Sequence, residues 1–372
     1  MEIAAVDENV AGDPGSVATS PGAGTPAIRL DAVTKTYPGA DSPAIDALTL
    51  DVPKGELVVF VGPSGCGKTT TLRLINRLEE PTSGTIQIDG ADVRDSAVHE
   101  LRRGIGYVIQ QGGLFPHQTI ATNIACVPKL LGWTKARIRD RVEELVELMR
   151  LDPSLLSRYP AELSGGQQQR VGVARALAVG PPVLLMDEPY SAVDPVVRAE
   201  LRAELRDLHD RLGTTIVLVT HDIDEAIEVG DRIAVFRNGG HLAQYAVPTE
   251  LLGRPADAFV EEFLGADRTL RRLSLLPVTT AHLEPAGTGA GEVLLPASTS
   301  LRSALDALLS RASERGTVVD ADGTVLGVVT VEAIAQIAAG EPDTQPLLRR
   351  AVDSATSGRP TPRRPPGDRV IG

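Results

Sequence analysis

A glycine-rich loop that ends in a lysine is the part of the sequence best suited to chemistry. It consists of Gly62, Pro63, Ser64, Gly65, Cys66, Gly67, Lys68, Thr69 and Thr70. The glycines let successive backbone N–H groups turn towards phosphate oxygens, Lys68 can reach the terminal phosphates, and the Thr69 hydroxyl can bind Mg²⁺. This spacing is typical of a P-loop, which predicts binding of a nucleoside triphosphate.

The residues around the loop predict the strand and the helix that hold it. The continuous apolar stretch 57–61 precedes the loop and has the pattern of a buried strand. Leu72, Ile75 and Leu78 follow it at helical spacing. A helix that starts at the loop adds the positive end of its dipole to the phosphate site. A chance match to the motif would not require such flanks, so a true P-loop is favoured.

A second apolar strand, predicted at 182–186, ends in two carboxylates, Asp187 and Glu188. Ligands of parallel sheets bind at the carboxyl ends of the strands. We expect Asp187 to contact Mg²⁺ directly or through water, and Glu188 to polarise a water for attack on the γ-phosphate. The alternative, a solvated strand end, is disfavoured by the apolar strand downstream of a P-loop.

Three further polar residues are candidates for contact with the nucleotide. Gln110 ends a predicted strand and could hydrogen-bond a Mg²⁺-bound or attacking water. His221 ends another and could bind the γ-phosphate and hold Glu188 in position. Tyr37 lies in a turn and could stack on adenine. The alternatives are a polar strand end, a capped histidine, and a turn tyrosine that packs on the sheet edge.

A second phosphate-facing surface is predicted where a helix begins directly after a short polar run. That run is Leu163, Ser164, Gly165, Gly166 and Gln167. Two glycines at a helix start expose amide donors and the dipole end, and the serine adds a hydroxyl. One molecule cannot easily use both surfaces on one ATP, so we expect this one to close over the P-loop of another copy. An ordinary N-cap serine with glycines for packing is the alternative.

Composition limits the classes of protein to which the chain can belong. Its 372 residues, 42% of them apolar, suffice for two domains. The net charge of −12 disfavours nucleic acid and bare anionic membranes, so membrane attachment should go through a protein partner. Cys66 and Cys126 are interpreted as reduced cytosolic thiols, and no apolar run has the length of a membrane span. These features predict a cytoplasmic protein.

The chain divides into four predicted segments. Residues 1–26 form a disordered leader, 27–267 an α/β core, 268–340 a second module, and 341–372 a disordered tail rich in proline and arginine. Within the core, residues from about 112 to 163 form a helical insertion. There Thr134 is a plausible N-cap, and Arg139 and Glu143 are spaced for an ion pair.

With these residues assembled, the sequence resembles the ATP-binding subunits of ABC transporters over about residues 27–265. The matching elements are the Walker A loop 62–70, Gln110 as the Q-loop, the signature 163–167, the Walker B residues Asp187 and Glu188, the D-loop Ser191 to Asp194, and the switch histidine His221. The resemblance implies an α/β P-loop NTPase cassette with a RecA-like core, a helical subdomain and an antiparallel β subdomain. It also implies ATP and Mg²⁺ as cofactors, with Thr69, Gln110 and Asp187 at the metal.

A finer resemblance is to importers of glycine betaine, carnitine, choline and proline betaine. It is carried by the segments 105–111, 113–117, 119–120, 123–124 and 127–130, a region that faces the permease in this family. The resemblance implies a homodimer at the cytoplasmic face of the membrane, attached to permease subunits and served by an extracytoplasmic substrate-binding protein, with no nucleic acid partner. Substrate is chosen by the other subunits.

The C-terminal module resembles a small α+β domain of the cystathionine-β-synthase (CBS) type. Ser300 caps a predicted helix, a hairpin turns at Asp322 and Gly323, and a second helix follows. Only one complete repeat is visible, with 268–296 as at best a degraded partner. Ala333 replaces the aspartate of adenosine-binding repeats. We therefore expect pairing with the copy on the other subunit, and hypothesise that the module inhibits the ATPase at low ionic strength.

Three other functions are alternatives for a chain with a P-loop. An ABC importer for another solute, such as an amino acid, would share every ATPase motif. A soluble ABC ATPase of DNA repair or translation usually has long coiled-coil insertions or two cassettes, and this chain shows neither. A P-loop kinase is disfavoured by the run 163–167.

Overall fold

The computed structural model describes residues 25–110, 113–191, 193–285, 291 and 293–339. The predicted tail and nearly all of the predicted leader lie outside these residues, as do Gln111 and Ala192. The chain forms two compact units, residues 1–242 and 243–372, which are treated separately below.

A six-stranded sheet in the order β10-β9-β3-β8-β7-β6 forms the core of the first unit, and β10 crosses the boundary between the units. The strands are β3 (Leu57–Val61), β6 (Ile105–Val108), β7 (Val183–Asp187), β8 (Thr215–Val219), β9 (Arg232–Arg237) and β10 (His241–Ala246). The pairs β3–β8, β3–β9, β6–β7 and β7–β8 are all parallel. Because β3, β7 and β8 are buried along their whole length, they carry the continuous apolar runs typical of parallel strands. Their carboxyl ends share one edge of the sheet.

A separate antiparallel sheet has the order β2-β1-β4-β5. Its strands are β1 (Ile28–Lys35), β2 (Ile45–Val52), β4 (Ser83–Ile88) and β5 (Ala91–Asp92). Strand β1 is central and pairs with β2 on one side and β4 on the other. Ile28 and Leu30 are fully buried while Arg29 between them is exposed, which is the alternation of a half-buried strand. The cassette thus has the predicted antiparallel β subdomain.

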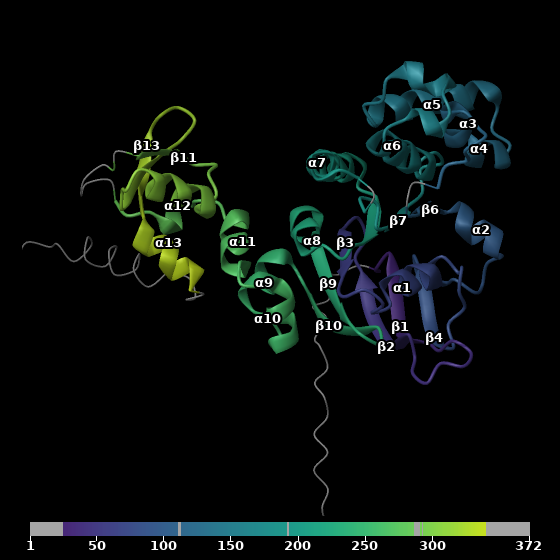
Figure 1. Cartoon of the computed structure of the whole chain (residues 1–372), viewed down its shortest axis with the longest axis horizontal. Coiled ribbons are helices and arrows are strands. Elements are labelled where there is room, and N and C mark those ends of the chain that lie inside the picture. Colours follow the sequence, from purple (N-terminus) through teal and green to yellow (C-terminus); the bar gives the residue numbers. More distant parts are fainter. Residues whose placement is uncertain (1–24, 111–112, 192, 286–290, 292, 340–372) are drawn as a thin grey trace, which may run out of the picture. The chain divides into compact units, whose positions relative to one another are not determined.

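The helices of the first unit surround the parallel sheet and build the helical subdomain. They are α1 (Lys68–Ile75), α2 (Val98–Arg103), α3 (Ile120–Ile124), α4 (Cys126–Leu130), α5 (Lys135–Leu148), α6 (Gly165–Ala176), α7 (Pro195–Leu212) and α8 (Ile223–Val229), with 3-10 turns at Pro153–Ser157 and Pro160–Glu162. Helices α3, α4 and α5 lie beside α6 (Figure 1). Thr134 caps α5 as predicted, and Arg139 lies 3.9 Å from Glu143. Along the described part of the chain, every helix is too short or too polar to span a bilayer.

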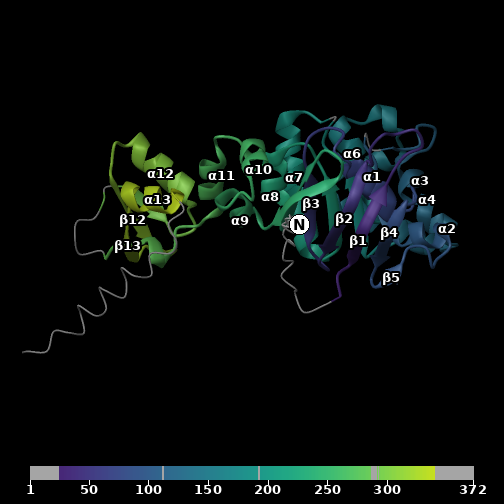
Figure 2. The ribbon, with the colours of Figure 1, turned by 90° about the horizontal axis from the view of Figure 1, so that it is seen from below.

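The second unit is a small α+β fold around a three-stranded sheet, order β11-β12-β13. Its elements are α9 (Pro248–Gly253), α10 (Ala258–Leu264), α11 (Arg268–Leu275), a 3-10 turn (Thr280–His282), β11 (Val293–Pro296), α12 (Leu301–Ser310), β12 (Arg315–Val319), β13 (Val325–Thr330) and α13 (Val331–Ala338). Figure 2 shows α12 and α13 beside β12 and β13. Ser300 caps α12, and β12 and β13 form the predicted antiparallel hairpin.

The segment 268–296 contributes to the core and to the sheet of this unit. Its residues Leu273 and Val293 pack into one core with Leu301 and Ile334. Strand β11 also pairs in parallel with β12, so it completes the same sheet. The unit begins at residue 243, ahead of the predicted boundary at 267, and therefore includes α9 and α10. Helix α11 contacts α9, which explains why these helices group with the C-terminal elements.

Candidate functional site

The P-loop connects β3 to α1 and is held in place by glycines that no other residue could replace without strain. Gly62 has a φ of 154°, and a Cβ there would lie 2.3 Å from the carbonyl oxygen of Phe236 on β9. Gly67 has a φ of 107°, and its Cβ would meet the Ile45 side chain at 2.5 Å. The Gly240 amide, in the β9–β10 turn, donates to the Cys66 carbonyl over 3.0 Å. The loop is thus fixed by strands on both sides.

Lys68 is buried within this loop. Its Nζ donates to the carbonyl oxygens of Gly62 at 2.7 Å and Pro63 at 2.9 Å, and lies 3.6 Å from Cys66 Sγ. These contacts hold the ammonium group against the loop that is expected to surround the phosphates. Both cysteines are free thiols, as predicted.

Thr69 and Asp187 bring two oxygen ligands together at the start of α1 and the end of β7. The threonine hydroxyl donates to Asp187 Oδ1 over 2.9 Å. Burial raises the pKa of Asp187, and the hydrogen bond from Thr69 opposes this shift. A hydroxyl and a carboxylate are hard oxygen donors, the type that Mg²⁺ prefers, so these residues fit the predicted metal.

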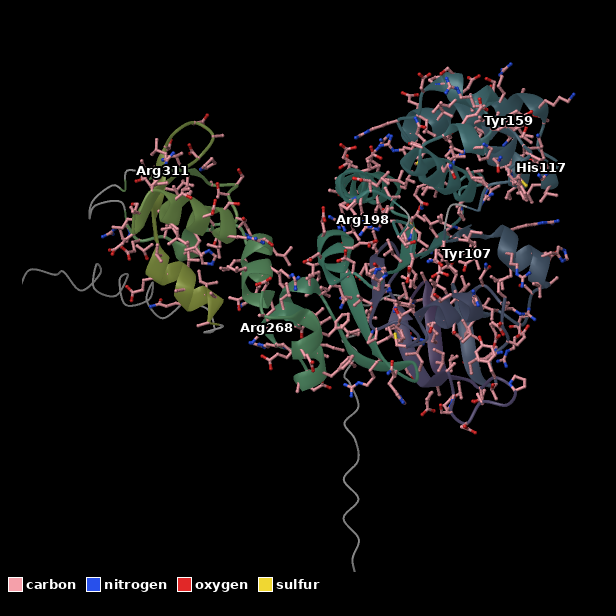
Figure 3. All side chains as sticks on the ribbon, in the orientation of Figure 1. Tyr107, His117, Tyr159, Arg198, Arg268 and Arg311 are labelled. Carbon is pink, nitrogen blue, oxygen red and sulfur yellow. The ribbon has the colours of Figure 1, made fainter. Side chains whose placement is uncertain are left out.

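Tyr107 on β6 (Figure 3) belongs to none of the motifs above, yet it interacts electrostatically with Asp187. Burial, followed by the charge of Asp187, raises the pKa of Tyr107 to about 12, so its phenol stays neutral. The alternation of side chains along β6 predicts which face of the sheet Tyr107 lies on. It does not predict that Asp187 is near, because this depends on the pairing of β6 with β7.

Glu188 lies between the two other predicted catalytic residues. Gln110 Nε2 donates to Glu188 Oε2 over 3.2 Å, and His221 Nδ1 lies 3.5 Å from Oε1. The Glu188 backbone is left-handed, with a φ of 44°, and its N–H donates to the Val219 carbonyl of β8. A non-glycine residue in this region is strained by about 1 kcal/mol or more, so the surrounding contacts must hold it. Three strand ends therefore aim Gln110, Glu188 and His221 at one another.

The signature run begins helix α6 with a capping box. Ser164 Oγ accepts from the Gln167 N–H at 3.3 Å, and Gln167 Oε1 accepts from the Ser164 N–H at 2.9 Å. Because the serine oxygen acts only as an acceptor in this cap, its own proton is available for a phosphate. Leu163 is buried, and a Cβ on Gly166 would lie 2.9 Å from Val197 on α7. A residue without a side chain at position 166 therefore lets α6 approach α7 closely.

The remaining predicted residues lie near the nucleotide loops or on the antiparallel sheet. Ser191 Oγ donates to the Glu188 carbonyl over 3.0 Å, which places the start of the D-loop against Walker B. The Asp194 carbonyl accepts from the Arg198 N–H at 2.8 Å as α7 begins. Tyr37 follows β1, with the Lys35 ammonium 4.9 Å from its ring centre. Stacking of Tyr37 on adenine stays a prediction.

Known proteins resemble the chain in both sequence and fold. Residues 45–191 match the ABC transporter family. The chain is 50% identical over 307 residues to the osmoprotectant import ATP-binding protein OsmV of Salmonella typhimurium, covering 81% of this chain and 78% of that protein. It is 45% identical over 309 residues to the glycine betaine/carnitine/choline transport ATP-binding protein OpuCA of Bacillus subtilis, covering 83% and 80%.

Among solved structures, one match is a dimeric ATP-binding cassette in a post-hydrolysis state, bound to ADP and Pi. It superposes with a TM-score of 0.54 at 36% identity, and the match covers 59% of this chain and 98% of that cassette. This agrees with the P-loop, the Walker B strand and the signature helix described above. The chain therefore belongs to the ATP-binding proteins of the ABC transporter family and groups there with the osmoprotectant import proteins.

Proposed function

We propose that this chain is the ATP-hydrolysing subunit of an importer for quaternary ammonium osmoprotectants such as glycine betaine, carnitine, choline and proline betaine. The observation that carries the hydrolytic role is the position of Glu188 between Gln110 and His221 at the end of β7. The osmoprotectant class is supported by relatives whose similarity covers 81% of the chain. Because the first unit comprises only residues 1–242, this similarity extends into the second unit.

In this proposal the site residues divide the work of hydrolysis. Lys68 and the amides of the P-loop bind and orient the phosphates. Thr69 and Asp187, with Gln110, would hold Mg²⁺, which when bound neutralises charge on the β- and γ-phosphates. Glu188 accepts the proton of the attacking water as general base, and His221 orients Glu188 and donates to the γ-phosphate. Tyr37 supplies a ring for adenine.

Each site is completed by a second copy. Ser164 and Gly166 of one subunit face the γ-phosphate held by the P-loop of the other, and the D-loop residues Ser191 and Asp194 lie at the same contact. The free hydroxyl proton of Ser164 and the dimeric state of the matched cassette support this arrangement. ATP binding then holds the two copies together, and hydrolysis releases them.

The helical subdomain is the proposed contact with the permease. Phe115, Leu130 and Tyr159 are large apolar or aromatic side chains that stay exposed there, and Leu130 is 70% exposed. Exposed apolar side chains of this size mark protein interaction sites when they lie on one surface. The chain would thereby be held at the cytoplasmic face of the membrane, while the substrate-binding protein acts on the permease from the other side.

The second unit is proposed to be a regulatory, CBS-like domain. Thr330 Oγ1 accepts from the Ala333 N–H at 3.1 Å and caps α13. The methyl group of Ala333 offers no carboxylate to a ribose, so adenosine binding is not expected. Pairing with the same unit of the other copy, and inhibition at low ionic strength, are the proposed roles.

Uptake measurements test the substrate class. In a strain that lacks the chain, expression of the wild type together with its permease should restore uptake of radiolabelled betaine, choline or carnitine, and Glu188→Gln should not. Restored uptake of an amino acid, with none of the three quaternary amines, would contradict the osmoprotectant assignment and favour an importer for another solute.

A further inference from the structure

Arg198 lies near the start of α7 (Figure 3) and contacts the D-loop. Its Nη2 donates to the Val193 carbonyl over 3.2 Å, and its backbone N–H donates to the Asp194 carbonyl over 2.8 Å. Val193 is buried. The guanidinium therefore holds the C-terminal half of the D-loop against the first turn of α7.

The same guanidinium reaches the segment that carries the switch histidine. Arg198 Nη1 lies 3.9 Å from Oδ2 of Asp222, the residue directly after His221. Asp222 is also the N-cap of α8, because its Oδ1 accepts from the N–H groups of Asp224 and Glu225. One side chain thus joins two loops that the proposed function places at ATP.

The residues on both sides of His221 are joined by hydrogen bonds. The Thr220 hydroxyl oxygen accepts from the Asp222 N–H at 3.0 Å and donates to Glu225 Oε2 at 2.8 Å. The Thr220 N–H donates to the Phe60 carbonyl of β3. Because Thr220 is anchored on β3, a displacement of Asp222 is not spread along the strand and acts on His221, which lies between them.

A neighbouring ion pair also joins the two helices. Arg202, one turn further along α7, lies 2.8 Å from Glu228 at the other end of α8. This pair is shorter than the Arg198–Asp222 pair. Partly exposed pairs contribute little to stability, so the longer pair adds little to the packing of α7 on α8. What distinguishes the Arg198 contacts is that they join the D-loop to the segment that carries His221.

We propose that Arg198 is a positioning residue that couples the D-loop to His221 within one subunit. This inference rests on the proposed function, in which the D-loop meets the ATP site of the second copy. A change at that site displaces Val193 and Asp194, Arg198 passes the displacement to Asp222, and His221 shifts relative to Glu188. The two ATP sites of a dimer communicate by this route.

The test is a double-mutant cycle with the full-length chain. Arg198→Gln removes the charge and keeps a hydrogen-bond donor, while Asp222→Asn removes the charge and keeps a good N-cap. Each should lower kcat about tenfold and change the KM for ATP by about twofold or less, and the double variant should be no slower than either single one. The Hill coefficient for ATP should fall towards one in all three.

Arg202→Gln is the matched control, because it breaks the other pair between the same helices, and its kcat and Hill coefficient should stay at the wild-type values. Effects of Arg198→Gln equal to those of Arg202→Gln, or additive effects in the double variant, would overturn the inference. A wild type that hydrolyses no ATP would instead count against the proposed function. If Arg198→Gln does not fold, Arg198→Lys keeps the charge opposite Asp222, and its kcat must then fall between those of the wild type and Asp222→Asn.

Discussion

The Thr69 hydroxyl donates to Asp187 Oδ1 over 2.9 Å, and this contact joins the helix that follows the P-loop to the Walker B strand. The two residues are 118 positions apart in the sequence. Both side chains can bind a metal ion through oxygen. Asp187 is buried, and burial is the main cause of its raised pKa. A divalent cation at this position would relieve the cost of a buried carboxylate charge.

We predict that Thr69→Ala weakens the binding of Mg²⁺, because it removes one of the three proposed ligands. The Mg²⁺ concentration for half-maximal ATPase activity should rise about tenfold or more, while Thr69→Ser, which keeps the hydroxyl, should stay near the wild type. A magnesium titration of all three proteins at fixed ATP measures this. Equal half-maximal concentrations in the alanine and serine variants would show that the hydroxyl is not a ligand.

Glu188→Gln should lower kcat about 100-fold or more and leave ATP binding intact, because a neutral amide cannot accept the proton of the attacking water. Gln110 and His221 would still contact the new side chain. With hydrolysis blocked, the variant should elute as a dimer in ATP and Mg²⁺. Monomeric elution under these conditions would contradict the prediction. Glu143→Gln, on the exposed face of α5, is the control and should hydrolyse ATP normally.

Much of this site could be predicted from the sequence because its motifs are local. The P-loop, the carboxylates after β7 and the capped start of α6 each depend on a few consecutive residues and on the strand or helix beside them. Their coming together follows from parallel strands, whose carboxyl ends share an edge. The left-handed conformation of Glu188 was not foreseeable, because it depends on contacts with Gln110, Val219 and His221.

Other features depend on packing between distant elements. The contact of Arg198 with Asp222 exists because α7 packs on α8, and the sequence gives no sign of it. Glu225 has the spacing of an ordinary helix residue, yet it is 4% exposed. The grouping of α9 with the C-terminal elements also depends on packing, because it follows from the contact of α9 with α11, which no local pattern in the sequence indicates.

Ser164 and Ser300 allow capping to be separated from catalysis, since both cap helices with the same side chain. Ser164→Ala and Ser300→Ala should each lower the free energy of unfolding of their unit by about 1 kcal/mol. Only Ser164→Ala should also lower the ATPase rate, because only that serine is proposed to meet the phosphate of a second copy. Urea unfolding and steady-state rates measure the two effects. Equal rates in both variants would assign Ser164 to capping alone.

Deletion of residues 248–372 tests the regulatory role of the second unit. The cut leaves β10 whole and removes α9 and α10 with the helix that packs against them. We expect the truncated chain, assembled with its permease, to transport at low ionic strength at the rate that the full chain reaches only at high ionic strength. An unchanged salt dependence of transport after the deletion would remove the regulatory hypothesis and leave the ATPase assignment in place.

Glu225 should make stability depend on pH near neutrality. Burial raises the pKa of Glu225 from its ordinary 4.5 to about 7, partly offset by the hydrogen bond from Thr220 and by the charges of Arg202 and Arg198, while Asp222 adds to the rise. At pH values between 4.5 and about 7, the folded chain therefore keeps a proton on Glu225 that the unfolded chain has released. The stabilisation is complete below about pH 4.5 and is lost as the pH rises through about 7.

We predict that Glu225→Gln removes this loss, because glutamine is neutral at every pH and can still accept from Thr220. The variant should gain stability over the wild type on going from pH 6 to pH 8, by on the order of 1 kcal/mol. Urea unfolding at both pH values measures the difference. Glu228→Gln, on the same helix but 45% exposed and paired with Arg202, is the control and should change little with pH. If the stability gap between Glu225→Gln and the wild type is the same at both pH values, Glu225 keeps its charge throughout this range, and burial does not govern its protonation.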